Sequence, residues 1–444
     1  MGTKLGWPRR VAAFFVLAWL AACTSRSGPA QPGSVLAGFD GNSIAAGVKG
    51  ATVAGGGQNG SPNRVTGDFG AVGGGEGNTA GEGSVVAGGE GNTAINFHAA
   101  VGGGQDNLAN AEEATVGGGL NNTASDRFAS VSGGSANLAS SYNAAVGGGS
   151  GNQATDQFAT VGGGTLNQAG NTAAVVAGGN HNQAQGPGSA ILGGVNNTAS
   201  GDTASIGGGA GNTAAGAYAV VPGGFANQAG GAYSFAAGRA AVVSPNHPGT
   251  FLFADDRLFS FPSLAADEFA VRATGGVRFV TALDAAGAPL AGVRLSPGSG
   301  SWESLSDAGA KAGFAPVDGD RLLAQLMAVP VSTWYYKGQS PAVRHIGPTA
   351  QDFHAAFGLG PDGHYISTID EEGVALAAVQ ALYHLVQAQQ AGSAAPAQAQ
   401  VASLRRQLAF SNGLALAALL LAALALIRGR GRVHREKLSL RRLS

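Results

Sequence analysis

The feature that most constrains this chain is a repeat with a constant period between positions 53 and 232. A β-branched residue recurs at the spacing that separates Val101 from Val116, except for one step that is shorter by a single position, and two or three glycines follow within three positions. An asparagine stands six residues after each β-branched residue, and an alanine stands eight residues after it. The β-branched positions are Val72, Val86, Val101, Val116, Val131, Val146, Val161, Val176, Ile191, Ile206 and Val221. This period is too short for a pair of helices and predicts one coil of a β-solenoid per repeat.

Each part of the repeat has a predicted role in the coil. The β-branched residue and its small neighbours predict a short strand that faces inward, and the glycines supply positive φ at a corner. The asparagine suits a second corner, because it tolerates left-handed backbone and its stacked copies can form a hydrogen-bonded ladder. Burying one Val contributes about 1.5–3 kcal/mol, whereas ordering each residue's backbone costs about 1–2 kcal/mol. We therefore expect several chains to associate.

The composition excludes several classes of function. The chain has 76 Gly among 444 residues and only 11% charged residues, unlike an ordinary globular enzyme. Residues 53–232 carry Arg64 and Arg127 as their only bases, so no nucleic-acid partner is expected. No Lys follows a glycine cluster as in a phosphate-binding loop, and no Asp recurs as in calcium-binding nonapeptide repeats. We expect no cofactor and no metal.

The N-terminus predicts export. Residues 1–22 have a basic start and an apolar run over 11–20 that is too short to span a bilayer, which is typical of a signal peptide. The only cysteine, Cys23, follows Leu-Ala-Ala, a pattern that resembles a bacterial lipobox. That resemblance implies cleavage before Cys23 and a diacylglycerol on its sulfur, with residues 23–34 as a tether. An ordinary signal peptide with an incidental Cys is the alternative.

The C-terminus predicts a membrane anchor. Residues 408–427 are apolar over a length that suits one helix across a bilayer. The basic tail 428–444 follows at once, so the positive-inside rule places it in the cytoplasm. A helical hairpin or an interfacial helix is the alternative. Together the two ends predict a bacterial cell-envelope protein whose repeat region is exported, either periplasmic or at the cell surface.

The repeat also carries a family resemblance. The V-G-G-G-x-x-N-x-A units, which close with Tyr-Ser-Phe-Ala-Ala-Gly at 233–238, resemble the head repeats of trimeric autotransporter adhesins. The resemblance implies a homotrimeric, left-handed β-roll over residues 35–240. A small β-rich connector without a site is expected over residues 241–301, where segments alternate in a β manner.

Residues 302–390 carry several separate motifs in order. They are LSDAGAK at 305–311, PVSTWYYK at 330–337, RHIGPTAQDF at 344–353 and DEEGVAL at 370–376. Together they resemble the intramolecular chaperone domain of endosialidase tailspikes, serine peptidase family seventy-four. The resemblance implies an α+β domain that trimerises a β-fibre and then cuts itself off. It implies no other enzymatic activity.

The same resemblance assigns the site. The family cuts before a Ser with a Ser–Lys dyad, which places the nucleophile at Ser306, the base at Lys311 and the scissile bond at Leu305–Ser306. A Ser hydroxyl needs a base to take its proton, and Lys serves when it is neutral, a state that burial favours. Relatives often carry a polar residue where this chain has Ala308 and Gly309. Without the surrounding motifs, Ser306 would be read as a residue that starts a helix.

Other residues of the domain have supporting or structural roles. Asp307 is a candidate supporting residue. His345 is a competing base, although a structural hydrogen-bonding corner is favoured for it. Asp352 and Glu371 are further acids whose distance from the dyad is open at this point. Residues 374–390 predict a helix with a broad apolar face, and the glycine and proline of 391–407 predict an interruption and a second short helix.

The organisation predicts why a chaperone is needed. Near-identical coils keep most contacts when one chain slides by a single repeat, so misaligned trimers have nearly the same energy. We therefore expect a trimeric fibre with an adhesive role, which the C-terminal domain aligns before it self-cleaves. A glycan-acting, tailspike-like protein and a membrane-tethered switch released by self-cleavage are the alternatives. The surface or glycan ligand of the fibre is not identified by the sequence.

Overall fold

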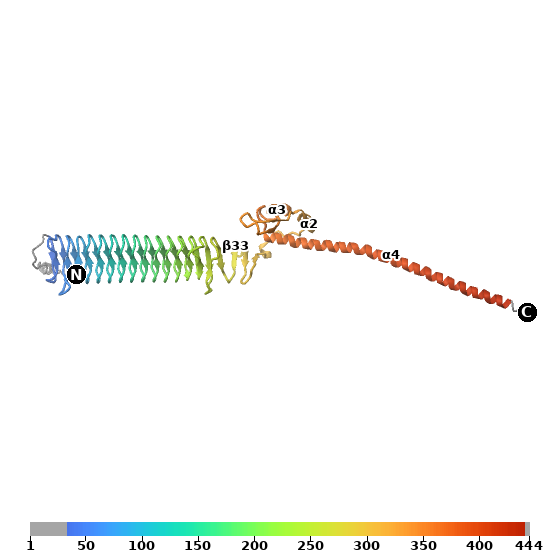
Figure 1. Cartoon of the computed structure of the whole chain (residues 1–444), viewed down its shortest axis with the longest axis horizontal. Helices are drawn as coiled ribbons and strands as arrows, with labels where there is room; N and C mark the ends of the chain where they lie inside the picture. Colours follow the sequence, from blue (N-terminus) through green and yellow to red (C-terminus); the bar gives the residue numbers. More distant parts are fainter. Residues whose placement is uncertain (1–32, 440–444) are drawn as a thin grey trace, which may run out of the picture. The chain divides into compact units, whose positions relative to one another are not determined.

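The computed structural model describes residues 33–439, which form two compact units (Figure 1). The first unit runs to Val277 and includes Ser296–Ser299, and the second comprises Arg278–Leu295 and the chain from Gly300 onward. The predicted signal peptide, Cys23 and most of the tether lie outside the described residues, as do the last five residues of the basic tail.

The first unit is a parallel β-solenoid, which confirms the predicted architecture (Figure 1). Its strands stack into one sheet of 17 strands and one of 15. The first sheet contains β1 (Val35–Leu36), β3 (Thr52–Val53), β5 (Ala71–Val72), β7 (Val85–Val86), β9 (Ala100–Val101), β11 (Thr115–Val116), β13 (Ser130–Val131), β15 (Ala145–Val146), β17 (Thr160–Val161), β19 (Val175–Val176), β21 (Ala190–Ile191), β23 (Ser205–Ile206), β25 (Val220–Val221), β26 (Gly224–Phe225), β28 (Phe235–Arg239), β30 (Phe251–Ala254) and β32 (Phe269–Arg272). The second contains β2 (Ser43–Ile44), β4 (Arg64–Val65), β6 (Thr79–Ala80), β8 (Thr93–Ala94), β10 (Leu108–Ala109), β12 (Thr123–Ala124), β14 (Leu138–Ala139), β16 (Gln153–Ala154), β18 (Gln168–Ala169), β20 (Gln183–Ala184), β22 (Thr198–Ala199), β24 (Thr213–Ala214), β27 (Gln228–Ala229), β29 (Ala241–Val243) and β31 (Phe261–Pro262).

Each coil of the repeat contributes two strands of two residues. The predicted inward strand ends in the β-branched residue, and Val116 pairs in parallel with Val101 before it and Val131 after it. The second strand ends in the alanine eight residues later, such as Ala124, which is also fully buried. The sequence pattern marked this alanine but did not predict the second strand.

The core of the solenoid closes within one chain. The repeated Val and Ala side chains, such as Val131 and Ala139, are 0% exposed without any partner chain. One chain is therefore enough to bury these residues. The glycine corners allow the coil to turn tightly enough that two small side chains fill its interior.

The repeated asparagines form the predicted ladder along the buried edge of the coils. Asn122 donates from Nδ2 to the carbonyls of Gly118 and Gly134, both at 2.9 Å. Its Oδ1 accepts the backbone N–H of Asn137 in the next coil at 3.0 Å. The side chain of Asn122 is fully buried. Each amide therefore satisfies backbone groups of neighbouring coils at once and joins those coils to one another.

The left-handed backbone was predicted at the repeated asparagine, but it occurs at the residue before it. The residues before the repeated asparagines adopt it: Asp106 has φ 53° and precedes Asn107, and Leu166 has φ 55° and precedes Asn167. The asparagine itself forms the ladder, because its side chain points into the coil and bonds to both glycine carbonyls. The corner therefore tolerates varied residues before the repeated amide.

The solenoid extends beyond residue 240, where the repeat was predicted to end. β28, β30 and β32 continue the parallel ladder to Arg272, and Phe235, Phe251 and Phe269 stack with ring centroids 4.5 and 4.9 Å apart. These last coils are longer than those of the repeat and differ from each other, so the constant period disappears although the parallel pairing continues. At this end Asp255 pairs with Arg272 at 2.7 Å.

The second unit contains both strands and helices. Its helices are α2 (Gly319–Ala328), α3 (Ala350–Phe357) and α4 (Thr368–Ser439), with the 3₁₀ turn η1 (Ala308–Ala310), and its strands are β33 (Val277–Leu283), β34 (Pro289–Leu295), β35 (Trp302–Ser304), β36 (Ser332–Trp334) and β37 (His345–Gly347). The α2 helix packs against the start of α4, where Leu322, Val374, Ala378 and Ala381 are buried. A Cβ at Gly319 would lie 2.8 Å from the Cβ of Ala381, so this glycine permits the close helix contact.

The interruption predicted for residues 391–407 is absent. The α4 helix runs through Pro396, which lies inside it, and continues to Ser439. A proline removes one helical hydrogen bond, but the alanine-rich sequence around it has the highest helix propensity and continues the helix. Within the described chain, α4 is the one helix that is long and apolar enough to cross a membrane, and it includes the predicted span 408–427.

Candidate functional site

A small antiparallel sheet leads the chain to the predicted scissile bond. β33, β34 and β35 are neighbours, with Val293 opposite Ser304 and Leu295 opposite Trp302. The turn between β33 and β34 is held by Asp284, whose Oδ1 accepts the N–H groups of Ala286 and Ala288 at 2.8 Å. The sheet therefore fixes the backbone up to the residues just before the bond.

Ser306 and Lys311, which the family resemblance had paired, lie within hydrogen-bond distance of each other. The chain turns through η1, where Asp307 Oδ1 accepts the N–H of Gly309 at 2.6 Å and the N–H of Lys311 bonds to the carbonyl of Ala308 at 3.2 Å. This tight turn reverses the chain, so that Lys311 Nζ donates to Ser306 Oγ at 2.6 Å. A base within hydrogen-bond reach of a hydroxyl is the geometry that nucleophile activation requires.

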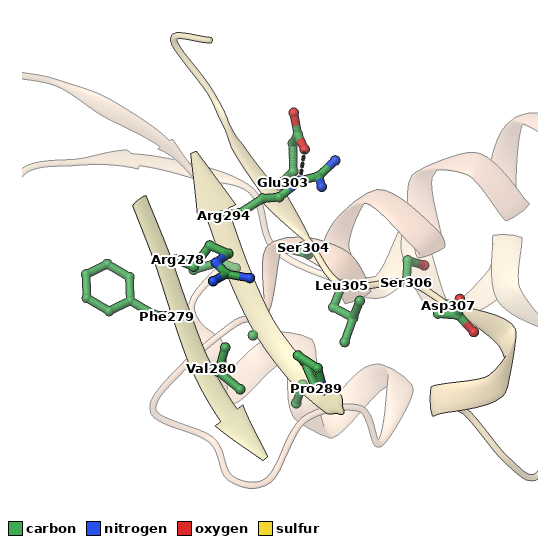
Figure 2. A pocket seen from close by; sticks show the side chains of 13 residues that line it. Arg278, Phe279, Val280, Pro289, Arg294, Glu303, Ser304, Leu305, Ser306 and Asp307 are labelled. Carbon is green, nitrogen blue, oxygen red and sulfur yellow. Dashed lines mark hydrogen bonds and ion pairs between the residues drawn. The ribbon is translucent and has the colours of Figure 1, made fainter. Parts of the chain in front are cut away.

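Asp307 supports this turn. It precedes η1 and caps it, as its side chain accepts the N–H of Gly309 (Figure 2). The side chains of Ser306 and Lys311 are both exposed in one chain. A single chain therefore brings the two groups together without shielding them from water.

The structure places His345 in an aromatic cluster. Its Nε2 lies 2.9 Å from Gln339 Oε1, and its ring stacks on Trp334 with the centroids 4.8 Å apart. Tyr336 completes the cluster at 5.4 Å. Among the described residues no hydrogen bond joins His345 to Ser306 or Lys311. These contacts hold the histidine ring within the aromatic cluster.

The two further acids also have other partners. Asp352 lies in the first turn of α3 and accepts the hydroxyl of Thr349 at 2.6 Å, while its N–H donates to the same hydroxyl at 3.2 Å. This reciprocal arrangement is a helix cap. Glu371 lines a separate cavity with Trp334 and Tyr336. Neither acid has a contact with the Ser306–Lys311 pair in the described structure.

A cavity of about 420 Å³ adjoins Ser306, and the sequence did not predict it (Figure 2). It is lined by residues of β33 and β34, among them Val280, Pro289 and Gly292, and by Leu305 and Ser306 themselves. A β-rich connector was predicted over residues 241–301, but its alternating segments lie at 249–255 and 268–273, before these strands. Only their pairing into a sheet reveals that they surround the residues before the bond.

One known family matches part of the second unit. Residues 306–359 match the model of the family described as chaperone of endosialidase, a family of self-cleaving peptidases. The match therefore begins at Ser306, and a β-solenoid precedes it in the chain. No curated protein matches the chain.

The fold and the family match together define a class of protein. Chaperone domains of this family act in trimers, and a solenoid of repeats followed by such a domain is the organisation of a fibre-like protein with a chaperone domain. The α4 helix could also anchor this protein in a membrane.

Proposed function

We propose that this chain is the subunit of a homotrimeric fibre of the bacterial cell envelope, which cuts its own Leu305–Ser306 bond after assembly. The observation that carries the proposal is the 2.6 Å hydrogen bond from Lys311 Nζ to Ser306 Oγ. The start of the family match at Ser306 supports the same bond. The fibre would have an adhesive role at the surface.

The cut proceeds in two steps. The neutral amine of Lys311 takes the proton of the Ser306 hydroxyl, and Oγ attacks the carbonyl carbon of Leu305. The C–N bond breaks, the nitrogen of Ser306 receives the proton from the lysine ammonium, and an ester joins Leu305 to Oγ. Water then hydrolyses the ester and leaves a carboxylate on Leu305 and a free amino group on Ser306.

Assembly supplies the switch in this proposal. Ser306 and Lys311 are exposed in one chain. Burial disfavours the charged form of a lysine. Neighbouring chains that cover the pair would therefore generate the neutral base only when the trimer exists. Cleavage would then follow alignment of the three solenoids and could not precede it.

The repeat explains why alignment must come first. Adjacent coils pair through equivalent residues, such as Val131 with Val146 and Val146 with Val161. A shift of one coil between chains would restore most contacts. A domain that trimerises through its own non-repetitive sequence sets one alignment, and the fibre retains it kinetically after the domain leaves.

The two products would keep different anchors. The upstream product would carry the lipid on Cys23, and the downstream product would carry α4 with its predicted membrane span and cytoplasmic tail. The chaperone domain would thus remain at the membrane after it releases the fibre.

Immunoblotting of the full chain with a tag at each end tests the proposal. Wild type gives two fragments, with Ser306 as the first residue of the downstream one. The variants Ser306→Ala and Lys311→Ala give one uncut band, whereas Ser304→Ala, a change of the nearest other serine, cuts normally. A single band from wild type, or continued cutting in Ser306→Ala, contradicts the proposal.

A further inference from the structure

The sheet holds the residue before the scissile bond and releases the chain directly after it. The N–H of Leu305 donates to the carbonyl of Gly292 at 2.9 Å, one residue beyond the end of β35. Among the described residues, neither the Leu305 carbonyl nor the Ser306 N–H has a backbone hydrogen bond. The peptide group to be cut is therefore the first one outside the sheet, where its carbonyl can be attacked.

The residue opposite Leu305 in the neighbouring strand is a glycine. Val293 lies opposite Ser304, so Leu305 lies opposite Gly292, and directly opposed residues of antiparallel strands project to the same face. Gly292 has no side chain to occupy that space. A Cβ there would lie 2.3 Å from the carbonyl oxygen of Phe279, so β33 and β34 approach closely only because this residue is glycine.

The cavity beside Leu305 has an apolar part. Val280, Pro289 and Val293 line it together with Leu305, whose side chain is directed toward the part of the sheet that carries Pro289 in Figure 2. Leu305 is 37% exposed, so its side chain is only partly covered in one chain. Charged side chains also line the cavity: Arg294 and Glu303 are paired with each other at 2.5 Å, and Arg278 of β33 lies beside them.

We propose that Leu305 determines the specificity of the self-cleavage, with its side chain seated in the apolar cavity of β33 and β34. The inference rests on the proposed cut at Leu305–Ser306. The hydrogen bond to Gly292 fixes the backbone along the strand, and the seated side chain prevents the chain from slipping by one residue. The carbonyl of Leu305 then stays within reach of Ser306 Oγ while η1 holds Lys311 behind it.

The chemistry of the cavity defines which side chains it accepts. A missing methylene in an apolar pocket lowers a rate by roughly 10–200-fold, and small misplacement of reacting atoms is similarly costly. An unbranched aliphatic side chain of similar volume keeps the contact. A carboxylate cannot make the apolar contacts with Val280, Pro289 and Val293, although Arg278 also lines the cavity.

The test uses the full chain with both tags and follows the fraction cut over time. Leu305→Ala is expected to cut at least roughly tenfold more slowly, Leu305→Met within about twofold of wild type, and Leu305→Asp not at all. Leu283→Ala is the matched control, because Leu283 is a 59% exposed leucine of β33 that does not line the cavity. Trimer content is measured for each variant by crosslinking, and the new N-terminus by mass spectrometry.

The outcomes separate this inference from the proposed function. If wild type cuts and Ser306→Ala does not, but Leu305→Ala and Leu305→Asp cut like wild type, Leu305 is no specificity determinant and the dyad still stands. If Ser306→Ala also cuts, the proposed function itself fails. If Leu305→Ala does not form trimers, the test uses Val280→Ala, which changes the opposite wall of the cavity. Slower cutting of Val280→Ala in intact trimers supports the inference, and an unchanged cutting rate overturns it.

Discussion

Two adjacent glycines of one coil differ in whether the structure has room for an alanine in their place, which makes them a test of the solenoid geometry. Gly134 has φ 95°, and a Cβ there would lie 2.2 Å from the carbonyl oxygen of Gly149 in the next coil and 2.6 Å from Nδ2 of Asn137. Gly133 has no positive φ, and the nearest atom to its Cβ would be the carbonyl oxygen of Gly118 at 3.8 Å. We predict that Gly134→Ala strongly destabilises the fibre and that Gly133→Ala does not.

The magnitude follows from three contributions. Left-handed backbone costs an L-residue about 1–2 kcal/mol, and inserting a methyl group into a filled space costs about 1–3 kcal/mol. Asn137 Nδ2 bonds to the carbonyls of Gly133 and Gly149 at 2.9 Å, and each bond disturbed costs about 1 kcal/mol. When both bonds are disturbed, these contributions add to a loss of about 4–7 kcal/mol for Gly134→Ala. Gly133→Ala instead gains about 0.4–1 kcal/mol, because alanine restricts the unfolded chain.

The assay is thermal unfolding followed by far-ultraviolet circular dichroism, in chains that also carry Ser306→Ala so that all samples are uncut. The expected loss lowers the melting temperature of Gly134→Ala by on the order of 10 °C, whereas Gly133→Ala melts at or slightly above the reference. Equal melting temperatures for the two variants would refute the derived geometry of the corner, since composition and position are otherwise matched.

Two further predictions concern buried polar groups of the solenoid. The hydroxyl of Ser189 is fully buried without a hydrogen-bond partner, so Ser189→Ala should stabilise the fibre by about 1 kcal/mol. Ser234→Ala should not stabilise it, because this change removes a 2.6 Å hydrogen bond. The reverse order of the two melting temperatures would contradict the prediction. Hydrogen bonds from the Thr274 backbone and side chain, and then from Arg272, hold the pKa of Asp255 far below its usual value. That contribution is present above the unfolded pKa of about 3.9 and is lost as the pH falls toward the folded pKa. The melting temperature of Asp255→Asn should therefore lie below wild type at neutral pH, and the gap should narrow in acid; a constant gap counts against it.

The repeat could be predicted from sequence because it depends on local backbone requirements. A strand that buries a Val, a corner that needs glycine and an asparagine that bonds backbone groups each require one residue type at one position. Repetition then shows the requirement many times over in a single chain. The second strand escaped prediction because its alanine satisfies packing without any preference for strand structure.

The end of the solenoid was harder to predict because its coils change length while their pairing does not. Phe235 and Phe251 pair directly, although their spacing along the chain exceeds that of the repeat and the small residues of earlier coils are replaced by aromatic rings. Periodicity depends on equal spacing along the chain, whereas a parallel ladder depends only on neighbouring strands in space. The helix that continues through Pro396 is a related case, because there the local signal predicted a break that the surrounding residues overrode.

The sequence by itself determined the solenoid, the family of the domain that follows it and the five-residue spacing of Ser306 and Lys311, because these depend on residue type and local order. Only the tertiary structure decided that this spacing is closed by a turn into a 2.6 Å contact. It also decided that His345 belongs to an aromatic cluster and that Leu305 lies opposite a glycine. These facts depend on which strands pair and in what register, and pairing joins residues that no local pattern connects.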